Sequence, residues 1–295
     1  MGPRITIGVP VFNGANYLER ALGSIESQTF ADFRVIISDN ASEDATEEIA
    51  RSFVARDERF GYSRNDRNIG AIPNYDKVFY ASTSEFFKWA AHDDWIEPGF
   101  VQACIERLDA SPVAVVAYTG ARQVDENDNQ IVGTIAHSNV TSPDPVERFR
   151  EIVRRERLNL PIFGVVRREV LARTNLQGSY HASARVLLAE LALLGTFERD
   201  PEVLFVHRNH PQGSLRSYAD AREVRKWYDT SATSKGHMPR WMYLRGLLAA
   251  AGIADLSAGQ RWSVRMEALR WATTKPKAML GDLVAAVRDR MSPEG

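Results

Sequence analysis

The sequence predicts an α/β protein with a mostly parallel, twisted sheet, helices on both faces of the sheet, and a helical extension at the C-terminal end. Apolar runs typical of buried strands alternate with segments of helical spacing over residues 5–118. A polar cluster follows four of these strands, at the sheet edge where ligands bind in such folds. From Trp227 onward the spacing is helical throughout.

The expected elements follow one another in simple β-then-α units. The strands are expected at 5–12, 33–38, 60–63, 85–91 and 113–118. The helices between them are expected at 17–27, 43–55, from near Pro73, and at 96–108. The turn signal Asn13-Gly14 separates the first strand from the first helix.

After Tyr118 the alternation weakens. The pattern there predicts an exposed hairpin, a polar helix, a short buried strand and an apolar-faced helix, at 123–133, 144–157, 161–166 and 183–194. Gly252 and Lys275-Pro276 should interrupt the helices that follow.

Composition bounds the class of protein. The 295 residues are 44% hydrophobic and carry 37 basic against 38 acidic side chains, which excludes a disordered chain and a strongly basic nucleic-acid binder. Residues 1–215 have 23 basic and 30 acidic side chains, whereas residues 216–295 have 14 and 8, so the net charge changes from −7 to +6. We therefore treat 1–215 as the body of the protein and 216–295 as a separate extension.

The single cysteine and the lack of long apolar runs predict where in the cell the protein is found. Cys104 alone excludes an internal disulfide framework and a cysteine zinc site, and is expected to be a packed helix residue. No apolar run approaches the ~18 residues that a membrane span needs. We expect a cytoplasmic protein that is soluble or attached peripherally to a membrane.

His92-Asp93-Asp94 is the sharpest chemical signal. Two adjacent carboxylates at the end of a buried strand repel each other, so burying them demands a cation or several donors. A Mg²⁺ or Mn²⁺ ion held by one carboxylate and by substrate phosphates would suit them. The alternative is a helix cap ahead of the helix expected at Ile96.

Two further polar clusters have the same ambiguity. Asp39-Asn40-Ala41-Ser42 could cap a helix, or Asp39 could accept hydrogen bonds from a base or a ribose. Asn68-Ile69-Gly70 could be an ordinary turn. Their common placement after parallel strands favours one shared cleft.

The ordered set of motifs resembles the family 2 glycosyltransferases, inverting enzymes with the A-type nucleotide-sugar fold. It consists of residues 5–13, 38–42, 67–70 with Asn74, and 91–96. The resemblance implies that 1–215 is a catalytic domain, with a nucleotide-sugar part at about 1–120 and an acceptor part at about 121–215. The implied partners are a nucleotide-diphosphate sugar donor and a glycan, lipid-linked or small-molecule acceptor, without nucleic acid.

The resemblance also implies a role for each matching residue. The metal, Mn²⁺ or Mg²⁺, would be held by Asp94, and Asp93 would contact the ribose. His92 stands where Asp or Thr is often found. The nucleotide-sugar site would comprise Val9, Pro10 and Phe12 beside the base, Asn13, Asp39 on the base, Asn68 by the sugar diphosphate, His92 and Asp93.

A late histidine pair could complete this site. His207-Arg208-Asn209-His210 lies on or after an expected strand, in a region from which similar enzymes often supply a metal or diphosphate contact. We favour His210 as the metal ligand, although a surface histidine before Pro211 is the plain alternative. Arg208 and Arg216 could offset diphosphate charge.

The expected catalytic base is missing. An inverting transfer needs a carboxylate to take the acceptor proton, and in similar enzymes an Asp opens the helix that corresponds to 183–188. Here Ser183 or, in the favoured register, Ala184 stands in its place. An engineered change, a natural variant with another base such as His181, or lost activity could explain this. Glu190 is about 9 Å farther along the helix, too far to substitute.

The alternatives are a sugar nucleotidyltransferase and a non-catalytic binding protein. A sugar nucleotidyltransferase would need a glycine-rich basic loop after the first strand, and this loop is not present. A dehydrogenase is disfavoured in the same way, because the sequence has no G-x-G-x-x-G. A non-catalytic nucleotide-sugar or glycan-binding relative stays open because of residue 184. For the Trp-rich basic extension, packing on the body or pairing into a homodimer competes with peripheral contact with an anionic membrane.

Overall fold

The computed structural model describes residues 2–135, 139–155, 159–211, 221–231 and 237–291. Within them the fold is built on one mixed sheet with the strand order β3-β2-β1-β4-β8-β6-β9-β5, and β7 pairs with β6. The strands are β1 (Ile5–Val11), β2 (Phe33–Asp39), β3 (Phe60–Arg64), β4 (Phe86–Trp89), β5 (Trp95–Ile96), β6 (Ala114–Val124), β7 (Gln130–Val132), β8 (Val165–Arg167) and β9 (Thr196–Arg208).

The long strand pairings are parallel, as predicted. β1 pairs in parallel with β2 and β4, β2 with β3, and β6 with β9. The antiparallel pairings, of β8 with β4 and β6, of β5 with β9 and of β7 with β6, are short. Because the first strands run in one direction, their carboxyl ends meet at one edge of the sheet.

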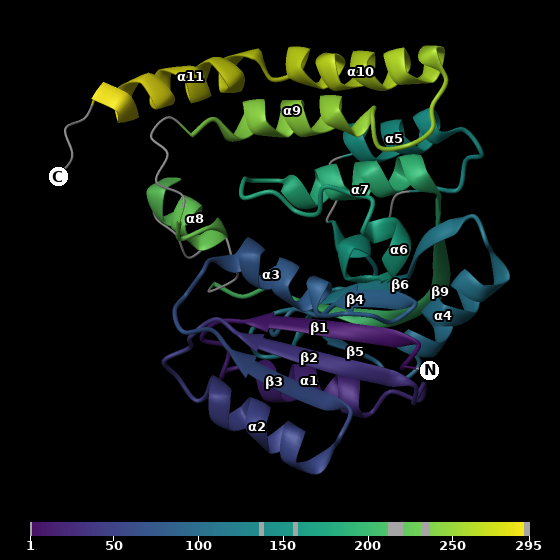
Figure 1. Ribbon diagram of the computed structural model, residues 1–295, viewed down its shortest axis with the longest axis vertical. Coiled ribbons are helices and arrows are strands. Elements are labelled where there is room, and N and C mark those ends of the chain that lie inside the picture. The colour runs from purple at the N-terminus through teal and green to yellow at the C-terminus, as the bar shows by residue number, and fades with distance from the viewer. Residues whose placement is uncertain (1, 136–138, 156–158, 212–220, 232–236, 292–295) are drawn as a thin grey trace.

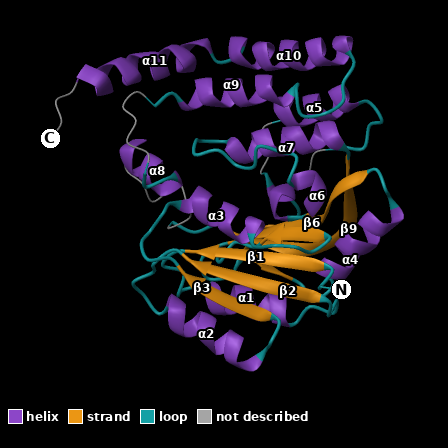
Figure 2. Cartoon of the chain, in the orientation of Figure 1, coloured by secondary structure: helices purple, strands orange, loops and turns teal. Residues whose placement is uncertain are grey.

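Helices cover both faces of the sheet (Figures 1 and 2). On one face α1 (Leu18–Glu26), α2 (Thr46–Arg56) and α4 (Phe100–Ala110) share a buried apolar cluster with the strands, and Cys104 is fully buried there. On the other face lie α3 (Ala71–Tyr80), α6 (Arg168–Leu171) and α7 (Ser183–Leu194). The predicted α/β class is confirmed.

Beyond α7, on the side away from the sheet, lie α5 (Pro145–Arg154), α9 (Pro239–Ala250), α10 (Ala258–Thr273) and α11 (Pro276–Met291) (Figure 1). The helix α8 (Ala221–Tyr228) is nearer the sheet and packs against α3. One apolar cluster runs from Phe87 and Trp89 on the sheet through α7 to Leu247 of α9 and Val264 of α10. The extension thus packs on the body through a shared core, while a boundary near residue 215 stays a prediction.

Two expected elements differ from the structure. The helix expected from Ile96 begins at Phe100, because Trp95 and Ile96 instead form β5 and pair with Val206 and Phe205 of β9. The strand expected at 161–166 is a 3₁₀ helix, Leu160–Phe163, followed by the short strand β8. The first difference comes from long-range strand pairing that local periodicity does not contain.

Within the described residues, no helix combines the length and the apolar composition that a membrane crossing requires.

Candidate functional site

The ends of β1 and β2 are tied together by side chains of the loops that follow them. Val11 and Asp39 are paired across the two strands, and the Asn40 N–H donates to the Val11 carbonyl at 2.8 Å. The Asn13 N–H donates to Ser42 Oγ, and Asn13 Oδ1 accepts from the Glu43 N–H, each at 2.9 Å. Asn13 and Ala41 have φ of 49° and 64°, a left-handed conformation that is uncommon for non-glycine residues, although asparagine adopts it more readily than most.

A network of amide side chains holds the loop after β3 against this edge. Asn40 Nδ2 donates to Asn68 Oδ1 at 2.8 Å, and Asn40 Oδ1 accepts from Asn65 Nδ2 at 2.9 Å. Asn74, at the start of α3, donates to the Ser38 carbonyl and accepts from the Ser38 hydroxyl. These bonds fix the loop by side chains rather than by a strand ladder.

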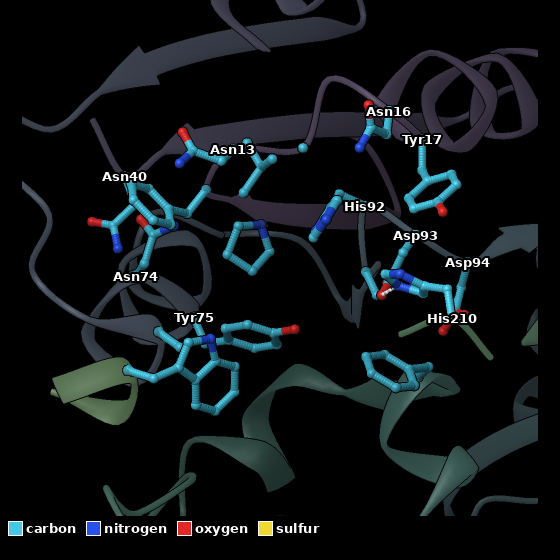
Figure 3. Close-up of a pocket in the computed structure, with 18 of the residues that line it drawn as sticks. Asn13, Asn16, Tyr17, Asn40, Asn74, Tyr75, His92, Asp93, Asp94 and His210 are labelled. Carbon is cyan, nitrogen blue, oxygen red and sulfur yellow. Dashed lines mark hydrogen bonds and ion pairs between the residues drawn. The ribbon is translucent and has the colours of Figure 1, made fainter. Parts of the chain in front are cut away.

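A cleft of about 270 Å³ opens at this edge of the sheet. Figure 3 shows amide side chains at one end and ionisable side chains at the other: Asn13, Asn40 and Asn74, then Asp93, Asp94 and His210. A second cavity of about 540 Å³ shares Phe12, Asn40, Ala71 and Trp227 with the first, so the two form one groove. The volume suits a ligand of nucleotide size.

Each carboxylate of the acidic pair has its own histidine. His210 Nε2 lies 3.1 Å from Asp93 Oδ2, and His207 Nδ1 lies 3.0 Å from Asp94 Oδ1. The Arg208 N–H also donates to Asp94 Oδ1, at 2.9 Å. Because the helix begins only at Phe100, the carboxylates do not cap it, and the cap alternative for this pair is wrong.

The two carboxyl groups differ in acidity. Burial raises the pKa of Asp94, and repulsion from Asp93 adds to this although His207 and the Arg208 N–H oppose it. Burial also acts to raise the pKa of Asp93, but the hydrogen bond from His210 and the charges of His92 and His210 outweigh it and lower that pKa. A buried carboxylate of raised pKa is a group that a cation would stabilise in its charged form.

A divalent cation fits the acidic end of the cleft only if protein side chains and substrate phosphates bind it together. Within the described residues, no group of three or more His, Cys, Asp or Glu side chains is arranged to hold a metal alone. The buried His210 Nδ1, however, has no hydrogen-bond partner within the protein, and Asp94 is buried beside the cleft. Mn²⁺ and Mg²⁺ commonly bind through one or two protein ligands plus substrate phosphates, so these residues fit such an ion.

Comparison with known proteins identifies the family. The sequence pattern described as Glycosyl transferase family 2 matches residues 6–173, more than half of the chain. The chain belongs to glycosyl transferase family 2. The match includes β1, β2, the amide loop and the acidic pair, and it ends before α7.

Curated relatives support the family over the same part of the chain. An uncharacterized glycosyltransferase of Rickettsia typhi is 29% identical over 130 residues, which is 44% of this chain and 40% of that protein. The putative glycosyltransferase EpsH of Bacillus subtilis is 32% identical over 101 residues, 34% of this chain and 29% of that protein. The chain thus matches less than half the length of these relatives.

Solved structures share the fold at low sequence identity. S. aureus TarS in complex with UDP-GlcNAc has a TM-score of 0.67 at 14% identity, covering 97% of this chain and 81% of that one. The mannosyltransferase PcManGT of Pyrobaculum calidifontis, in complex with GDP-Man and Mn²⁺, has a TM-score of 0.52 at 17% identity, covering 100% of this chain and 89% of that one. The A-type fold expected for this family 2 chain is therefore confirmed.

Most of the predicted site residues meet at the groove. Those lining it are Pro10, Phe12, Asn13, Asn68, His92, Asp93, Asp94 and His210. Val9 does not line the groove, because its side chain is fully buried in the core beneath the cleft.

Asp39 and Arg208 have settings different from those expected. The fully buried Asp39 carboxylate accepts from the Ser42 N–H, from Tyr62 Oη and from Arg64 Nη1, each at 2.8 Å. The Arg208 side chain is 3% exposed, pairs with Asp128 and donates to the carbonyls of Asp93, Asp125 and Glu126. Both residues hold loops around the groove. Arg216 lies outside the described residues.

The candidate base positions lie outside the groove's lining. Ala184 is in the first turn of α7, half-buried against the core shared with the extension. Part of the His181 side chain is exposed at the surface. Its ring is nevertheless partly desolvated, and this desolvation, with the nearby charges of Arg240 and Arg185, lowers its pKa. Glu190 is buried, and its carboxylate accepts hydrogen bonds from the backbone N–H and the side-chain amide of Asn175. The role of residue 184 stays a prediction.

Sequence reasoning missed the contribution of the extension to the groove. Trp227, together with Glu223, Lys226 and Thr230, lines the cavity opposite Asn68. The Thr230 hydroxyl donates to the Asn68 carbonyl at 2.9 Å, which places this segment directly over the amide loop. No local motif marks α8 as part of the site; only the Trp content of the extension hinted at a special surface.

Proposed function

We propose that this chain transfers a sugar, with inversion, from a nucleotide-diphosphate donor to an acceptor hydroxyl, with Mn²⁺ or Mg²⁺ bound at Asp94. The observation that carries the proposal is the Asp93–Asp94 pair, in which Asp94 is buried and Asp93 half-buried. Each carboxylate has a histidine beside it, and the pair lies at one end of a groove of nucleotide size. Family membership and the UDP-GlcNAc and GDP-Man complexes of proteins with the same fold support it.

The nucleotide would occupy the amide end of the groove. Phe12 is 38% exposed and lines both cavities, so its ring is available to stack on a base. Trp227 lines the same two cavities and could close over that base. The Nδ2 groups of Asn13 and Asn68 can donate to base or sugar groups, whereas their Oδ1 atoms already accept hydrogen bonds within the protein.

The diphosphate would lie toward the acidic end. A divalent ion bound there would neutralise charge on the leaving diphosphate. Asp94 and His210 would hold this ion, and His207 would orient the Asp94 carboxylate. Asp93 would remain ionised and accept a hydrogen bond from a ribose hydroxyl. The buried Arg208 fixes the backbone of Asp93 and of the loop at 125–126 around them.

Calorimetry of nucleotide binding tests this arrangement. UDP and GDP should bind more tightly with Mn²⁺ than without it, and Asp94→Ala should abolish the metal-dependent part. Asp109→Ala is the matched control, because Asp109 is an exposed aspartate that pairs with Arg4 away from the groove. Equal affinity with and without Mn²⁺ for the unmodified chain would refute the metal assignment.

Residue 184 decides between catalysis and binding alone. A general base contributes about 10²–10⁴-fold to a rate, so Ala184→Asp should raise turnover by that order if Ala184 stands where the base belongs. The assay uses UDP-, GDP- and dTDP-sugars with Mn²⁺, and Ala258→Asp in the first turn of α10 is the control. If the unmodified chain and Ala184→Asp both bound nucleotide but neither turned over a donor, the alternative would be favoured. That alternative is a non-catalytic nucleotide-sugar or glycan-binding protein.

A further inference from the structure

The outer surface of α10 and α11 exposes a row of large apolar side chains, one part of it on each helix. In α10 the row is Trp262, Met266 and Leu269, and in α11 it is Leu280, Val284, Val287 and Met291. Trp262 is 64% exposed, Leu280 61% and Met291 79%. Successive members are three or four residues apart within each helix, so they lie on one face of it.

The two helices extend this row along one side of the molecule. Each has 16 residues, and in Figure 1 they follow one another end to end on the side farthest from the sheet. At 1.5 Å per residue, the stretch from Trp262 to Met291 is about 44 Å long. An exposed apolar surface of this extent marks an interaction site.

The inner faces of both helices are already occupied. Val264 and Ala268 of α10 and Met279 of α11 are buried in the core shared with α9 and α7. Trp241 of α9 donates its indole N–H to the Met279 carbonyl at 3.1 Å. Rotation of the helices about their axes would therefore expose the residues of the inner faces, so it could not bury the row without loss of these contacts.

The charges of α10 and α11 are segregated between the two faces. The sequence has three carboxylates in 258–291, and each is paired inward: Glu267 with Arg154, Asp282 with Arg240 and Asp289 with Arg225. The exposed charges are cationic and flank the apolar row: Arg261, Arg265, Arg270, Lys277 and Arg288. Apolar side chains flanked by Lys and Arg are typical of helices that lie in the interface of a membrane.

We infer that the outer face of α10 and α11 docks on a lipid bilayer with anionic headgroups. The apolar row enters the boundary between headgroups and acyl chains, and the flanking cations lie among the headgroup phosphates. A second copy of the chain is a poorer occupant, because an isologous contact through this face would bring its cationic flanks together without a carboxylate to pair with them. The inference goes beyond the donor site and does not depend on it.

Flotation of the full chain with vesicles tests the inference. The chain should float with phosphatidylcholine vesicles that contain phosphatidylglycerol, should remain behind with pure phosphatidylcholine, and should be released by salt. Leu280→Glu with Val284→Glu should weaken partitioning roughly 100-fold. Val113→Glu is the matched control, because Val113 is 66% exposed just before β6 and outside this face.

A second variant keeps the test decisive if the paired glutamates disturb folding. Arg265→Gln with Arg270→Gln and Lys277→Gln leaves the apolar row intact and should weaken binding to anionic vesicles about tenfold or more. Circular dichroism and nucleotide binding should not change. No flotation with anionic vesicles at low salt, or equal flotation of the Gln variant and the unmodified chain, would overturn the inference. A dimer in sedimentation that Leu280→Glu dissolves would assign the face to a second copy instead.

Discussion

The groove at the strand ends and the outer face of α10 and α11 use charge in opposite ways. In the groove, Asp93 and Asp94 line the cavity, and neighbouring histidines and the Arg208 N–H hold them there. In α10 and α11 the carboxylates turn inward as anchors and leave apolar and cationic side chains outside. The first arrangement suits a cation with a polyanion, and the second suits an anionic surface.

The difference teaches how each surface is determined. Sheet topology forces the loop residues of the groove together, because parallel strands end at one edge. The outer helical face is what remains after the inner faces have been buried. The segment α8 joins the two regions, since it lines the groove and belongs to the extension.

Asp39 gives the largest expected effect, and it tests how rigid the groove edge is. Asp39→Ala removes the acceptor of the Ser42 N–H, Tyr62 and Arg64, so we expect a loss of about 3 kcal/mol in the free energy of unfolding, together with weaker nucleotide binding. Urea unfolding measures the first and calorimetry the second. Asp66→Ala, an exposed change in the next loop, is the control. Lost affinity at unchanged stability would mean that Asp39 serves the ligand alone.

Gly70 tests the coupling between the two regions. Its φ of 91° and ψ of 162° are essentially restricted to glycine, and an added Cβ would lie 2.5 Å from Asp229 Cα, next to α8. Gly70→Ala should cost about 1–3 kcal/mol and push α8 off the groove. Hydrogen exchange in 221–231 should increase and nucleotide affinity should fall. Gly61→Ala, where the added atom meets only ordinary contacts, should change neither.

Much of the fold could be predicted because it is local. Periodicity placed the β1 to β4 units and predicted α7 at 183–194, where the structure has it. The strand β5 could not be predicted, since two residues become a strand only by pairing with β9, more than 100 positions later. The same pairing positions His207 and His210 beside the acidic pair.

The site was predictable where residues follow strands and unpredictable where the chain returns to them. His92, Asp93 and Asp94 come two residues after the end of β4, so their placement follows from topology. Trp227 reaches the groove only because α8 packs against α3, more than 140 positions earlier in the chain, and no motif in the sequence encodes this contact. Similarly, the full set of donors around Asp39 depends on Tyr62 and Arg64 of a neighbouring strand.

Trp227 sharpens the comparison, because it asks whether the extension contributes to ligand binding. Trp227→Ala removes an aromatic wall that both cavities share, so nucleotide affinity should fall about fivefold to tenfold, or about 1 kcal/mol. Trp262→Ala, on the outer face of α10, should leave nucleotide affinity unchanged and weaken vesicle binding. If both substitutions had the same effect on nucleotide binding, α8 would have no specific part in the groove.

Glu267 gives the smallest expected effect and tests the inward anchoring of α10. The hydrogen bond from Arg154 lowers the pKa of Glu267 against the opposing effect of burial. A lowered pKa in the folded state stabilises the protein above the unfolded pKa of about 4.3, and this contribution is lost as the pH falls through the folded value. Because Arg154 is 46% exposed, we expect less than about 1 kcal/mol.

Urea unfolding of the unmodified chain and of Glu267→Gln between pH 7 and pH 3 measures this contribution. The difference in free energy of unfolding should be present at neutral pH and should shrink toward zero at the acidic end. Glu151→Gln is the control for a local ion pair that does not involve α10, because Glu151 pairs with Arg155 at the end of α5 and also accepts from the Asn139 N–H. A difference that did not change with pH would mean that Glu267 holds α10 by packing, and the inward carboxylates would then not be the electrostatic anchors that leave the outer face cationic.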